Sequence, residues 1–417
     1  MTDTGSSTAM IVEDESLAIH RAQYATLDRC TYLNFGARGV LPLSARDAIL
    51  SSLDTMQSVG PASRAAAAWI EYEVAATRAD LGRLVGAPPD RIAIVDSVSS
   101  ACALAILGIP WRTGDHALLC DSEPPGTWAT LRQVADRFGI RFSSFSFRDG
   151  TTDAACATRL LEELRPTTRL VIVSHVDWIT GCRRDLSRLQ SVVRQGPCPE
   201  ARILIDGAQS VGVLPVNVAT LGVDLYAFGG QKWLGGPDGI AALFVSESAQ
   251  LHIQPTLVGW RGVEPTVDGL DLRPARDARR FESGTCAYAL LAGLRQAVAA
   301  QESFAPLALR SDRILQLNRR LRSKLRAASR RALRDTLHVL GEDSDSGITT
   351  FTIAGTDPAE LVRRLERAGL IVRQHFTPPS VRACVHYLTL DREIDQFCDE
   401  LVRACTDGAV QHRHRGA

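Results

Sequence analysis

Lysine is almost absent from this chain. Of its 417 residues, 47 are lysine or arginine, and the only two lysines are Lys232 and Lys324. Arginine therefore does nearly all of the cationic work, so a lysine that is kept points to chemistry that a guanidinium cannot do. An ammonium can lose its proton and attack a carbonyl carbon, whereas a guanidinium stays protonated.

The chain also lacks net charge, long apolar runs and paired cysteines. Its formal net charge is zero, which gives no reason to expect nucleic acid or an anionic membrane as a partner. No apolar run approaches the roughly 18 to 20 residues that a membrane-spanning helix needs, and the N-terminal sequence lacks the pattern of a signal peptide. The 10 cysteines form no CxxC pair, which argues against a metal site. We therefore predict a cytoplasmic protein with reduced cysteines.

Length and patterning predict an α/β protein of two domains. A chain of 417 residues is too long for one ordinary core. Short apolar strands alternate with helical patterns, which is typical of a mostly parallel sheet. The predicted strands include Arg91–Val95, His116–Cys120, Arg141–Phe147, Leu170–Ser174 and Ile203–Ile205. We expect a large domain over 45–290, a small α+β domain from 16–44 plus 291–410, and disordered ends at 1–15 and 411–417.

Two apolar runs in the middle of the chain end near residues suited to catalysis. The first run ends in Asp206, and the second leads to Lys232 about a helix later. Glycines flank the lysine, and because they lack a Cβ they would let the backbone approach a ligand; they are Gly229, Gly230, Gly235 and Gly236. Two buried strands ending in an ordinary Asp and Lys would give the same pattern. The scarcity of lysine favours a Schiff-base lysine that holds pyridoxal phosphate (PLP), with Asp206 as partner of the pyridinium nitrogen.

The same stretch resembles the fold-type I PLP enzymes of the class V aminotransferase family, which includes cysteine desulfurases, cysteine C–S lyases and isopenicillin N epimerase. The family pattern D-x-A-Q-S, a spacer and [ST]-x-H-K-x-x-G-P is matched here by Asp206, Ala208, Gln209, Ser210, Lys232, Gly236 and Pro237. The resemblance covers about residues 30 to 405. It implies a fold-type I PLP-dependent transferase fold, PLP as cofactor with Gln209 and Gln231 beside it, and a homodimer.

Two further segments fit the phosphate of such a cofactor. The strand Arg91–Val95 runs into a hydroxyl-rich turn and a helix start, where free N–H groups and the helix dipole suit an anion. Ser99 and Ser100 are the best candidates there, although a serine at a helix start is also an ordinary cap. The stretch Arg279–Thr285 resembles the family segment R-F-E-x-G-T, which implies that Thr285 reaches the phosphate of the neighbouring subunit.

The resemblance also marks residues for catalysis and for the substrate. His175 lies in a segment similar to S-H-V-x-x-x-T-G, and we predict it on the cofactor side, with a structural histidine as the alternative. Asn34 lies in a segment similar to Y-L-N-x-x-x-x-G, which implies a place near the substrate carboxylate unless it is a turn residue. Arg382 matches the arginine of R-[AI]-S-x-x-x-Y, which implies that it binds that carboxylate in bidentate fashion; Arg373 is the reserve.

Three positions depart from the family pattern. Gln231 replaces the histidine before the lysine, and Gly229 replaces a phosphate-binding Ser or Thr. Pro124 stands where the C–S lyase segment D-x-E-H-P-G has a histidine that stacks on the cofactor ring. Because proline has no π face, Trp128, about one helical turn further on, is the candidate substitute, unless it only packs in the core.

The predicted activity is cleavage of the C–S bond of a cysteine-type amino acid or S-conjugate by α-proton removal at Lys232 and β-elimination. Desulfurases of this family carry a sulfur-accepting cysteine on a loop before the carboxylate-binding arginine, and this chain has no cysteine between Cys286 and Arg382. Cys384 fits a small core residue better. Epimerisation, transamination, decarboxylation and oxidative deamination share the early steps and stay open, as does a non-catalytic scaffold.

Overall fold

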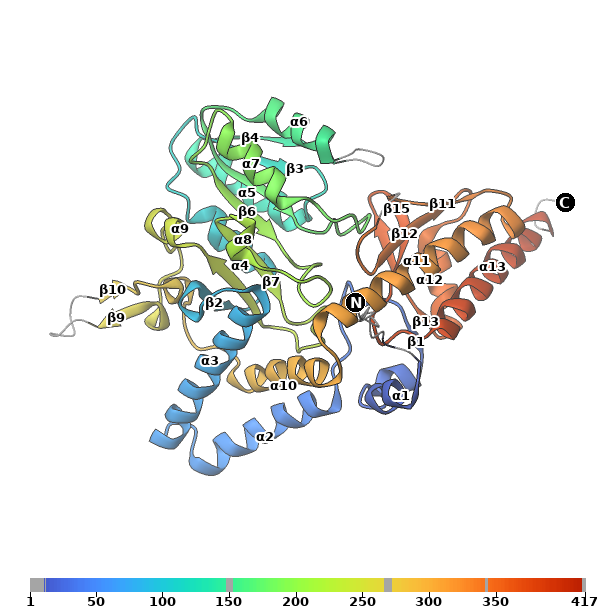
Figure 1. Cartoon of the computed structure of the whole chain (residues 1–417), viewed down its shortest axis with the longest axis horizontal. Helices are drawn as coiled ribbons and strands as arrows, with labels where there is room; N and C mark the ends of the chain where they lie inside the picture. The colour runs from blue at the N-terminus through green and yellow to red at the C-terminus, as the bar shows by residue number, and fades with distance from the viewer. Residues whose placement is uncertain (1–10, 12, 148–152, 266–271, 342–343, 415–417) are drawn as a thin grey trace, which may run out of the picture.

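The computed structural model describes residues 11, 13–147, 153–265, 272–341 and 344–414 (Figure 1). Most of the predicted disordered N-terminus, 1–10 and 12, and the last three residues lie outside this set. Helix α13 (Asp391–His414) continues past Gln411, where we expected a disordered tail. No helix in the described part of the chain is both long and apolar enough to cross a membrane.

A seven-stranded sheet forms the centre of the larger unit (Figure 1). Its strand order is β2-β8-β7-β6-β5-β3-β4. Neighbouring strands are parallel, except that β8 runs antiparallel to both β2 and β7. The strands are β2 (Ile92–Val95), β3 (His116–Cys120), β4 (Arg141–Phe145), β5 (Thr168–Ser174), β6 (Arg202–Asp206), β7 (Leu225–Gly229) and β8 (Ala241–Val245). This architecture confirms the predicted α/β class.

Helices cover both faces of this sheet, which explains why its central strands β6, β7 and β8 are buried at every position. One face packs on α4 (Val98–Leu107) and α5 (Pro125–Phe138). The other packs on helices that include α3 (Arg64–Val85), α7 (Leu186–Gln195) and α10 (Tyr288–Phe304). Alternation along β6 sends Leu204 to the first face and Ile203 and Ile205 to the second. Asp206 therefore faces the α4 side.

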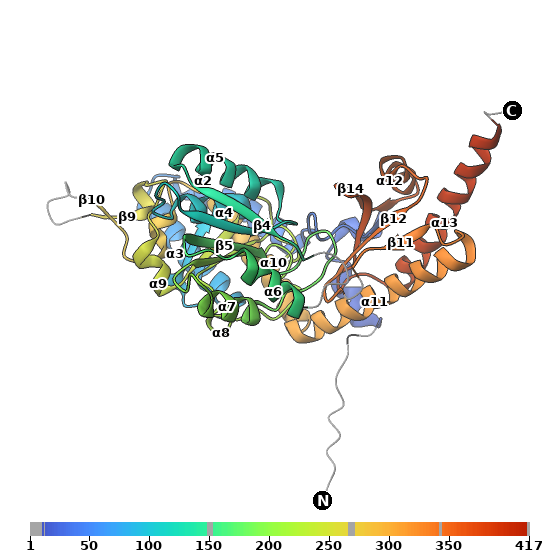
Figure 2. The ribbon, with the colours of Figure 1, turned by 90° about the horizontal axis from the view of Figure 1, so that it is seen from above.

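A second, antiparallel sheet of order β11-β12-β15-β14 forms the smaller unit beside the first (Figure 1, Figure 2). Its strands are β11 (Leu337–Val339), β12 (Ile348–Ile353), β14 (Arg373–Phe376) and β15 (Pro379–Cys384). Helices α11 (Leu307–Ala332), α12 (Pro358–Arg367) and α13 cover one of its faces with an apolar core. Near the N-terminus, β1 (Thr31–Tyr32) pairs with β13 (Leu370–Ile371).

Two long helices connect the units in a way that the predicted domain boundary did not anticipate. The boundary between residues 290 and 291 falls inside α10, which continues to Phe304. Helix α10 packs against α2 (Leu43–Val59) and α3, at the lower edge of the large-sheet unit in Figure 1. After α10 the chain crosses to the small-sheet unit with α11.

Candidate active site

The carboxyl ends of β5, β6 and β7 meet at one edge of the large sheet, where ligands of parallel sheets commonly bind. Asp206 is the last residue of β6, and its backbone oxygen accepts a hydrogen bond from His175 N at 2.9 Å. Its Oδ1 accepts from Ala208 N at 2.9 Å. Burial raises the pKa of Asp206, while Lys232 and the Ala208 amide oppose that rise.

Lys232 follows β7 by three residues, in the turn that brings the chain back toward β8. Burial lowers the pKa of its ammonium to about 8, against the attraction of Asp206, and Arg382 and Arg373 lower it further. A lysine with a pKa near 8 is partly neutral at physiological pH, and the neutral amine is the form that attacks carbonyl carbon and accepts protons. The arrangement therefore prepares Lys232 for both tasks.

One polar face of the small sheet closes this site. Alternation places Arg373, His375, Ser380, Arg382 and Cys384 on one face of β14 and β15, whereas Val381 and Ala383 join the apolar core behind them. The polar face meets the loop after β5. There the Trp178 carbonyl accepts from Arg382 Nη1 at 2.8 Å, and the Trp178 ring stacks on His375 with centroids 4.8 Å apart. The site thus lies between the two sheets.

Several buried polar atoms at this site have no partner within the described ranges. They are Asn34 Oδ1, Gln231 Oε1, Arg382 Nε and both ring nitrogens of His375. Buried polar groups in native proteins are nearly always hydrogen-bonded, so a cluster of unpaired ones indicates where a bound molecule supplies the missing partners. The predicted residues Asn34, Gln231, Lys232, Arg373 and Arg382 belong to this site or face it.

The predicted cofactor-side role of His175 does not agree with its position. Ser174 is the register partner of Asp206, so the next residue, His175, points to the opposite face of the sheet. There its Nδ1 lies 2.8 Å from the hydroxyl of Tyr226, a residue of the core on the α3 and α7 side. Burial lowers the pKa of His175 to about 3. This histidine is a neutral core residue, the alternative that the sequence left open.

Trp128 also packs elsewhere. Its ring contacts Phe142 of β4 edge to face, with centroids 6.2 Å apart, and it borders the apolar core on that side of the sheet. Because β4 is an edge strand separated from β6 by β3 and β5, this position does not bring Trp128 to Asp206. The tryptophan that the structure does bring to the site is Trp178.

Gln209 has both ends of its amide satisfied by protein. Its Nε2 donates to the Gly36 carbonyl at 2.9 Å, and its Oε1 accepts from Trp233 Nε1 at 2.9 Å. It ties the segment that carries Asn34 to the segment that carries Lys232, rather than offering a free group to a cofactor.

The glycines around Lys232 make room for protein rather than for a ligand. A Cβ at Gly230 or Gly236 would lie 2.7 or 2.5 Å from a Leu294 methyl of α10. A Cβ at Gly229 would collide with Gln231 Oε1. Two departures from the family pattern are therefore linked, because the amide of Gln231 occupies the space that a side chain at position 229 would need.

The serine turn lies at the start of α4, as expected, but one of its serines is already engaged. Ser97 caps the helix by accepting from Ser100 N at 3.1 Å, and the two hydroxyls lie 2.9 Å apart. Ser99 is exposed at the first turn, where helix N–H groups are free. Ser100 and the exposed Thr285 line a common cavity of about 380 Å³.

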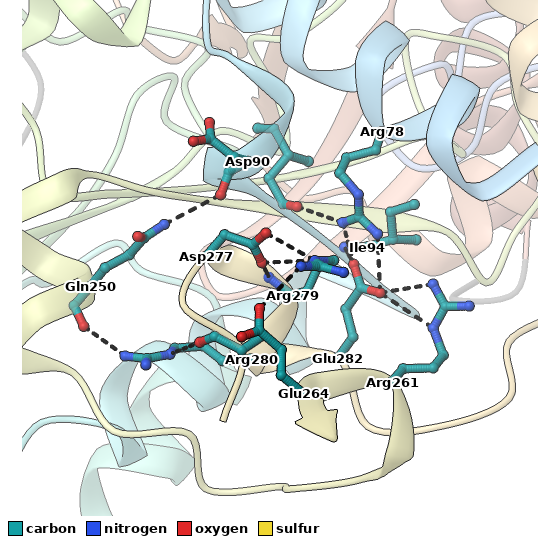
Figure 3. A network of polar contacts seen from close by, with 12 residues as sticks. Arg78, Asp90, Ile94, Gln250, Arg261, Glu264, Asp277, Arg279, Arg280 and Glu282 are labelled. Carbon is teal, nitrogen blue, oxygen red and sulfur yellow. Dashed lines mark hydrogen bonds and ion pairs between the residues drawn. The ribbon is translucent and has the colours of Figure 1, made fainter. Parts of the chain in front are cut away.

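A buried ionic network holds the strand that leads into this turn (Figure 3). Glu282 accepts hydrogen bonds from Ile94 N at 2.9 Å, from Arg261 Nη2 at 2.8 Å and from Arg78. Arg78 also donates to the Ile92 carbonyl at 2.6 Å. Since β2 is an edge strand, these contacts satisfy edge groups that would otherwise lack partners, and they join β2 to the segment that ends in Thr285.

Glu123 lies just past β3, at the strand ends where the sequence already indicates a ligand site because the carboxyl ends of parallel strands share an edge, and it is buried beside Ser174. Sequence reasoning missed two residues near the site, Trp178 and His375, which form the stacked pair across the two sheets. The stacked pair joins segments about two hundred residues apart, and no local pattern marks it.

Comparisons with known proteins agree with this geometry. The family model for class V aminotransferases matches residues 46–397. The chain belongs to the class V aminotransferase family. Isopenicillin N epimerase from Streptomyces clavuligerus is 29% identical over 88% of this chain and 93% of its own length. A probable cysteine desulfurase from Methanothermobacter thermautotrophicus is 26% identical over 78% of this chain and 82% of its own.

Solved structures are also similar to this chain. The cystine C–S lyase C-DES, in complex with its product cysteine persulfide, is 35% identical with a TM-score of 0.86, covering 91% of this chain and 99% of that chain. A C-DES mutant with glycine covalently linked to its PLP cofactor is 34% identical with the same TM-score, covering 92% of this chain and 98% of that chain. The fold is that of fold-type I PLP enzymes, and the protein is a PLP-dependent enzyme rather than a non-catalytic scaffold.

The residues present fit PLP. Lys232 would supply a nucleophilic amine for its aldehyde, Asp206 a buried carboxylate for its ring nitrogen, and the free N–H groups at the start of α4 an anion site for its phosphate. Gln231 Oε1, in the residue next to the lysine, is buried without a hydrogen-bond partner in the described part of the chain, so a bound group could supply one. When bound, PLP supplies an electron sink for the charge that develops when a substrate loses its α-proton.

Proposed function

We propose that this class V enzyme cleaves the C–S bond of a cysteine-type amino acid or S-conjugate. The observation that carries the proposal is that Lys232 interacts electrostatically with one carboxylate, Asp206, and with the two guanidiniums of Arg382 and Arg373. Neither Arg373 nor Arg382 forms an ion pair with any residue that the structure describes. A site with a reactive amine and two uncompensated arginines fits an amino acid, whose carboxylate takes the place of the missing partner. The likeness to a cystine C–S lyase favours sulfur at Cβ.

In this proposal each group of the chain has one task. Arg382 binds the α-carboxylate and, with Asn34, orients the substrate so that its α-proton faces the Lys232 amine. Lys232 accepts that proton as general base. The bond from Cβ to sulfur then breaks, the sulfur leaves as a thiol or persulfide, and hydrolysis of the remaining fragment gives pyruvate and ammonia.

The environment of Cys384 argues against a persulfide on the protein. Its side chain is fully buried, and burial raises the pKa of the thiol even though Arg382, Arg373 and Lys232 lower it. A Cβ on Gly36 would lie 2.8 Å from its Sγ, so that segment covers the sulfur closely. A protonated, covered thiol is a poor nucleophile, because the thiolate is the form that attacks sulfur.

The test is to supply cysteine, cystine and S-substituted cysteines and to measure pyruvate, alanine and protein-bound persulfide. The proposal predicts pyruvate, with no persulfide on the protein. Alanine together with a persulfide on Cys384 would show a desulfurase instead.

Epimerisation is the second candidate, because the similarity to isopenicillin N epimerase extends over 88% of this chain. It needs the same amine and the same carboxylate contact but returns the proton to the other face of Cα. Chiral chromatography can monitor the configuration of an S-substituted cysteine during the reaction. Inversion at Cα with no released pyruvate would favour epimerisation over the lyase reaction.

We also propose that the enzyme works as a homodimer with shared active sites. Thr285 and the nearby apolar side chains Leu257, Val258 and Trp260 are exposed in the single chain. Large exposed apolar groups that gather on one surface mark interaction sites. Sedimentation should give a dimer, and Thr285→Ala should weaken PLP binding. A monomer that is fully active at low nanomolar concentration would exclude shared sites.

A further inference from the structure

Glu123 places a second buried carboxyl group beside Asp206. It follows the end of β3 by three residues, and only 4% of its surface is exposed. Its Oε1 accepts from Ser174 N at 2.6 Å, and its Oε2 lies 2.9 Å from Ser174 Oγ. Ser174 is the register partner of Asp206, and partners in a sheet direct their side chains to the same face. The two carboxyl groups therefore share the α4 side of the sheet.

The other carboxylates near this position have a cation, and Glu123 has none. Asp206 faces Lys232, and Asp177 pairs with Arg184 at 3.1 Å. Glu123 forms no ion pair with any residue in the described ranges. A carboxylate buried without a cation is expensive, and the usual response is that it keeps its proton.

The ionisable groups that interact electrostatically with Glu123 can add only negative charge. Asp206 on β6 and Asp177 after β5 act on its pKa, and Glu123 in turn acts on the pKa of Cys102 on α4 and Cys120 on β3. Burial, followed by the charge of Asp206, raises the pKa of Glu123 to about 8 against the opposing hydrogen bonds from Ser174. Burial also raises the pKa of both thiols, so they stay neutral. Two carboxyl groups in one dry site ionise one at a time.

We propose that Glu123 is a positioning residue of the cofactor site, which keeps its proton at neutral pH and so leaves Asp206 as the ionised member of the pair. Ser174 N can only donate, so it fixes Oε1 as the acceptor. The Ser174 hydroxyl donates to Oε2 when Glu123 is ionised, and it turns to accept when Oε2 carries the proton. The same two contacts hold the end of β5 against the end of β3. This inference concerns the charge of Asp206 and does not depend on which substrate the enzyme takes.

The direct test is infrared spectroscopy of the full-length protein and of Glu123→Gln, which keeps the shape and removes the titration. Wild type should show the carbonyl band of a protonated carboxylic acid at neutral pH, and this band should titrate with a midpoint of about 8. The band should be missing from E123Q. The matched control is Glu163→Gln, because Glu163 also accepts from a serine hydroxyl, Ser143 at 3.2 Å, but is partly exposed. E163Q should keep the band.

Asp206→Asn tests the coupling and does not depend on the folding of E123Q. Removing the neighbouring charge should move the midpoint of the Glu123 band to lower pH, because that charge is one of the causes that raise it. A midpoint that does not move, or a wild-type protein without the band at neutral pH, overturns the inference. Neither result depends on a turnover assay, so a failed C–S lyase assay and a failed Glu123 inference can be told apart.

Thermal unfolding against pH gives an independent readout. The pKa of Glu123 is higher in the folded protein than the ordinary value of 4.5, so its contribution to stability is complete below about 4.5 and is lost as pH rises through about 8. E123Q lacks this pH-dependent contribution to stability. The stability of wild type relative to E123Q should therefore fall between about pH 5 and pH 9. A constant difference across that range contradicts a buried, proton-holding Glu123.

Discussion

Arg373 on β14 and Arg382 on β15 are direct register partners, and both lower the pKa of Lys232. Two guanidiniums side by side repel each other unless an anion joins them. Their difference in burial separates their roles, because Arg382 is 1% exposed whereas Arg373 is exposed. A substrate carboxylate that binds here meets Arg382 in the interior and Arg373 at the entrance.

Arg382→Met should therefore raise KM for S-substituted cysteines by about thirtyfold or more, since loss of a buried partner from a charge pair costs about 2 to 5 kcal/mol. Arg373→Met is the matched variant on the neighbouring strand and should have a smaller effect, because its charge is solvated. Steady-state kinetics of both variants decides the matter. A larger loss in R373M than in R382M would reverse the assignment.

The pH dependence of cofactor capture reports the Lys232 amine. The neutral amine is the reactive form, so the rate at which cofactor-free protein binds PLP should rise with pH and level off above a midpoint of about 8. Removing the positive charge in R382M should move this midpoint up, and removing the negative charge in Asp206→Asn should move it down. Stopped-flow absorbance follows both shifts. A midpoint that neither variant moves would show that these charges do not act on Lys232.

Asp206 should control α-proton removal. Asp206→Ala should keep part of the cofactor but slow α-proton exchange by several orders of magnitude, because a charge that stabilises the transition state is lost. Asp224 is the control, since it is also buried in the same unit but is bound to Arg194 and Arg202 at 2.7 and 3.0 Å. Asp224→Asn should lower the stability of the protein, but the rate of α-proton exchange in the folded protein should not change. Near-normal exchange in D206A would make Asp206 structural.

Much of the fold could be predicted from the sequence because strand bounds and the order of elements are local information. The strand predicted over His116–Cys120 has those bounds in the structure. Asp206 ends β6 and Lys232 follows β7 at one edge of the sheet because parallel strands end together. These features need only apolar runs and their spacing.

The rest of the site could not be predicted, because it depends on the face of the sheet to which a side chain points and on which residue fills the space beside a glycine. The β5 strand is buried on both faces, so its sequence shows no alternation to indicate that His175 points away from Asp206. The glycines near Lys232 show that a Cβ is missing, but not that Leu294 or Gln231 fills the gap. The stack of Trp178 on His375 depends on how two distant units meet.

The Glu282 network should carry a large share of local stability. Glu282→Ala would leave Arg78 and Arg261 without their buried carboxylate and Ile94 N without an acceptor. Removing one partner from a buried ion pair costs about 3 to 5 kcal/mol in the free energy of unfolding. Denaturant unfolding measures this loss. The control is Glu360→Ala, which breaks exposed pairs with Arg363 and Arg364 and should change little. Equal effects would contradict the network's role.

The central claim is that Lys232 holds the cofactor, and the scarcity of lysine allows a direct measurement. The chain has only one other lysine, Lys324, which pairs with Asp395 at 2.9 Å on the surface of the small-sheet unit. Borohydride reduction of the holoenzyme, digestion and peptide mass spectrometry should find a pyridoxyl group on Lys232, present in Lys324→Ala and absent in Lys232→Ala. A pyridoxyl group on Lys324, or on neither lysine, would contradict the account.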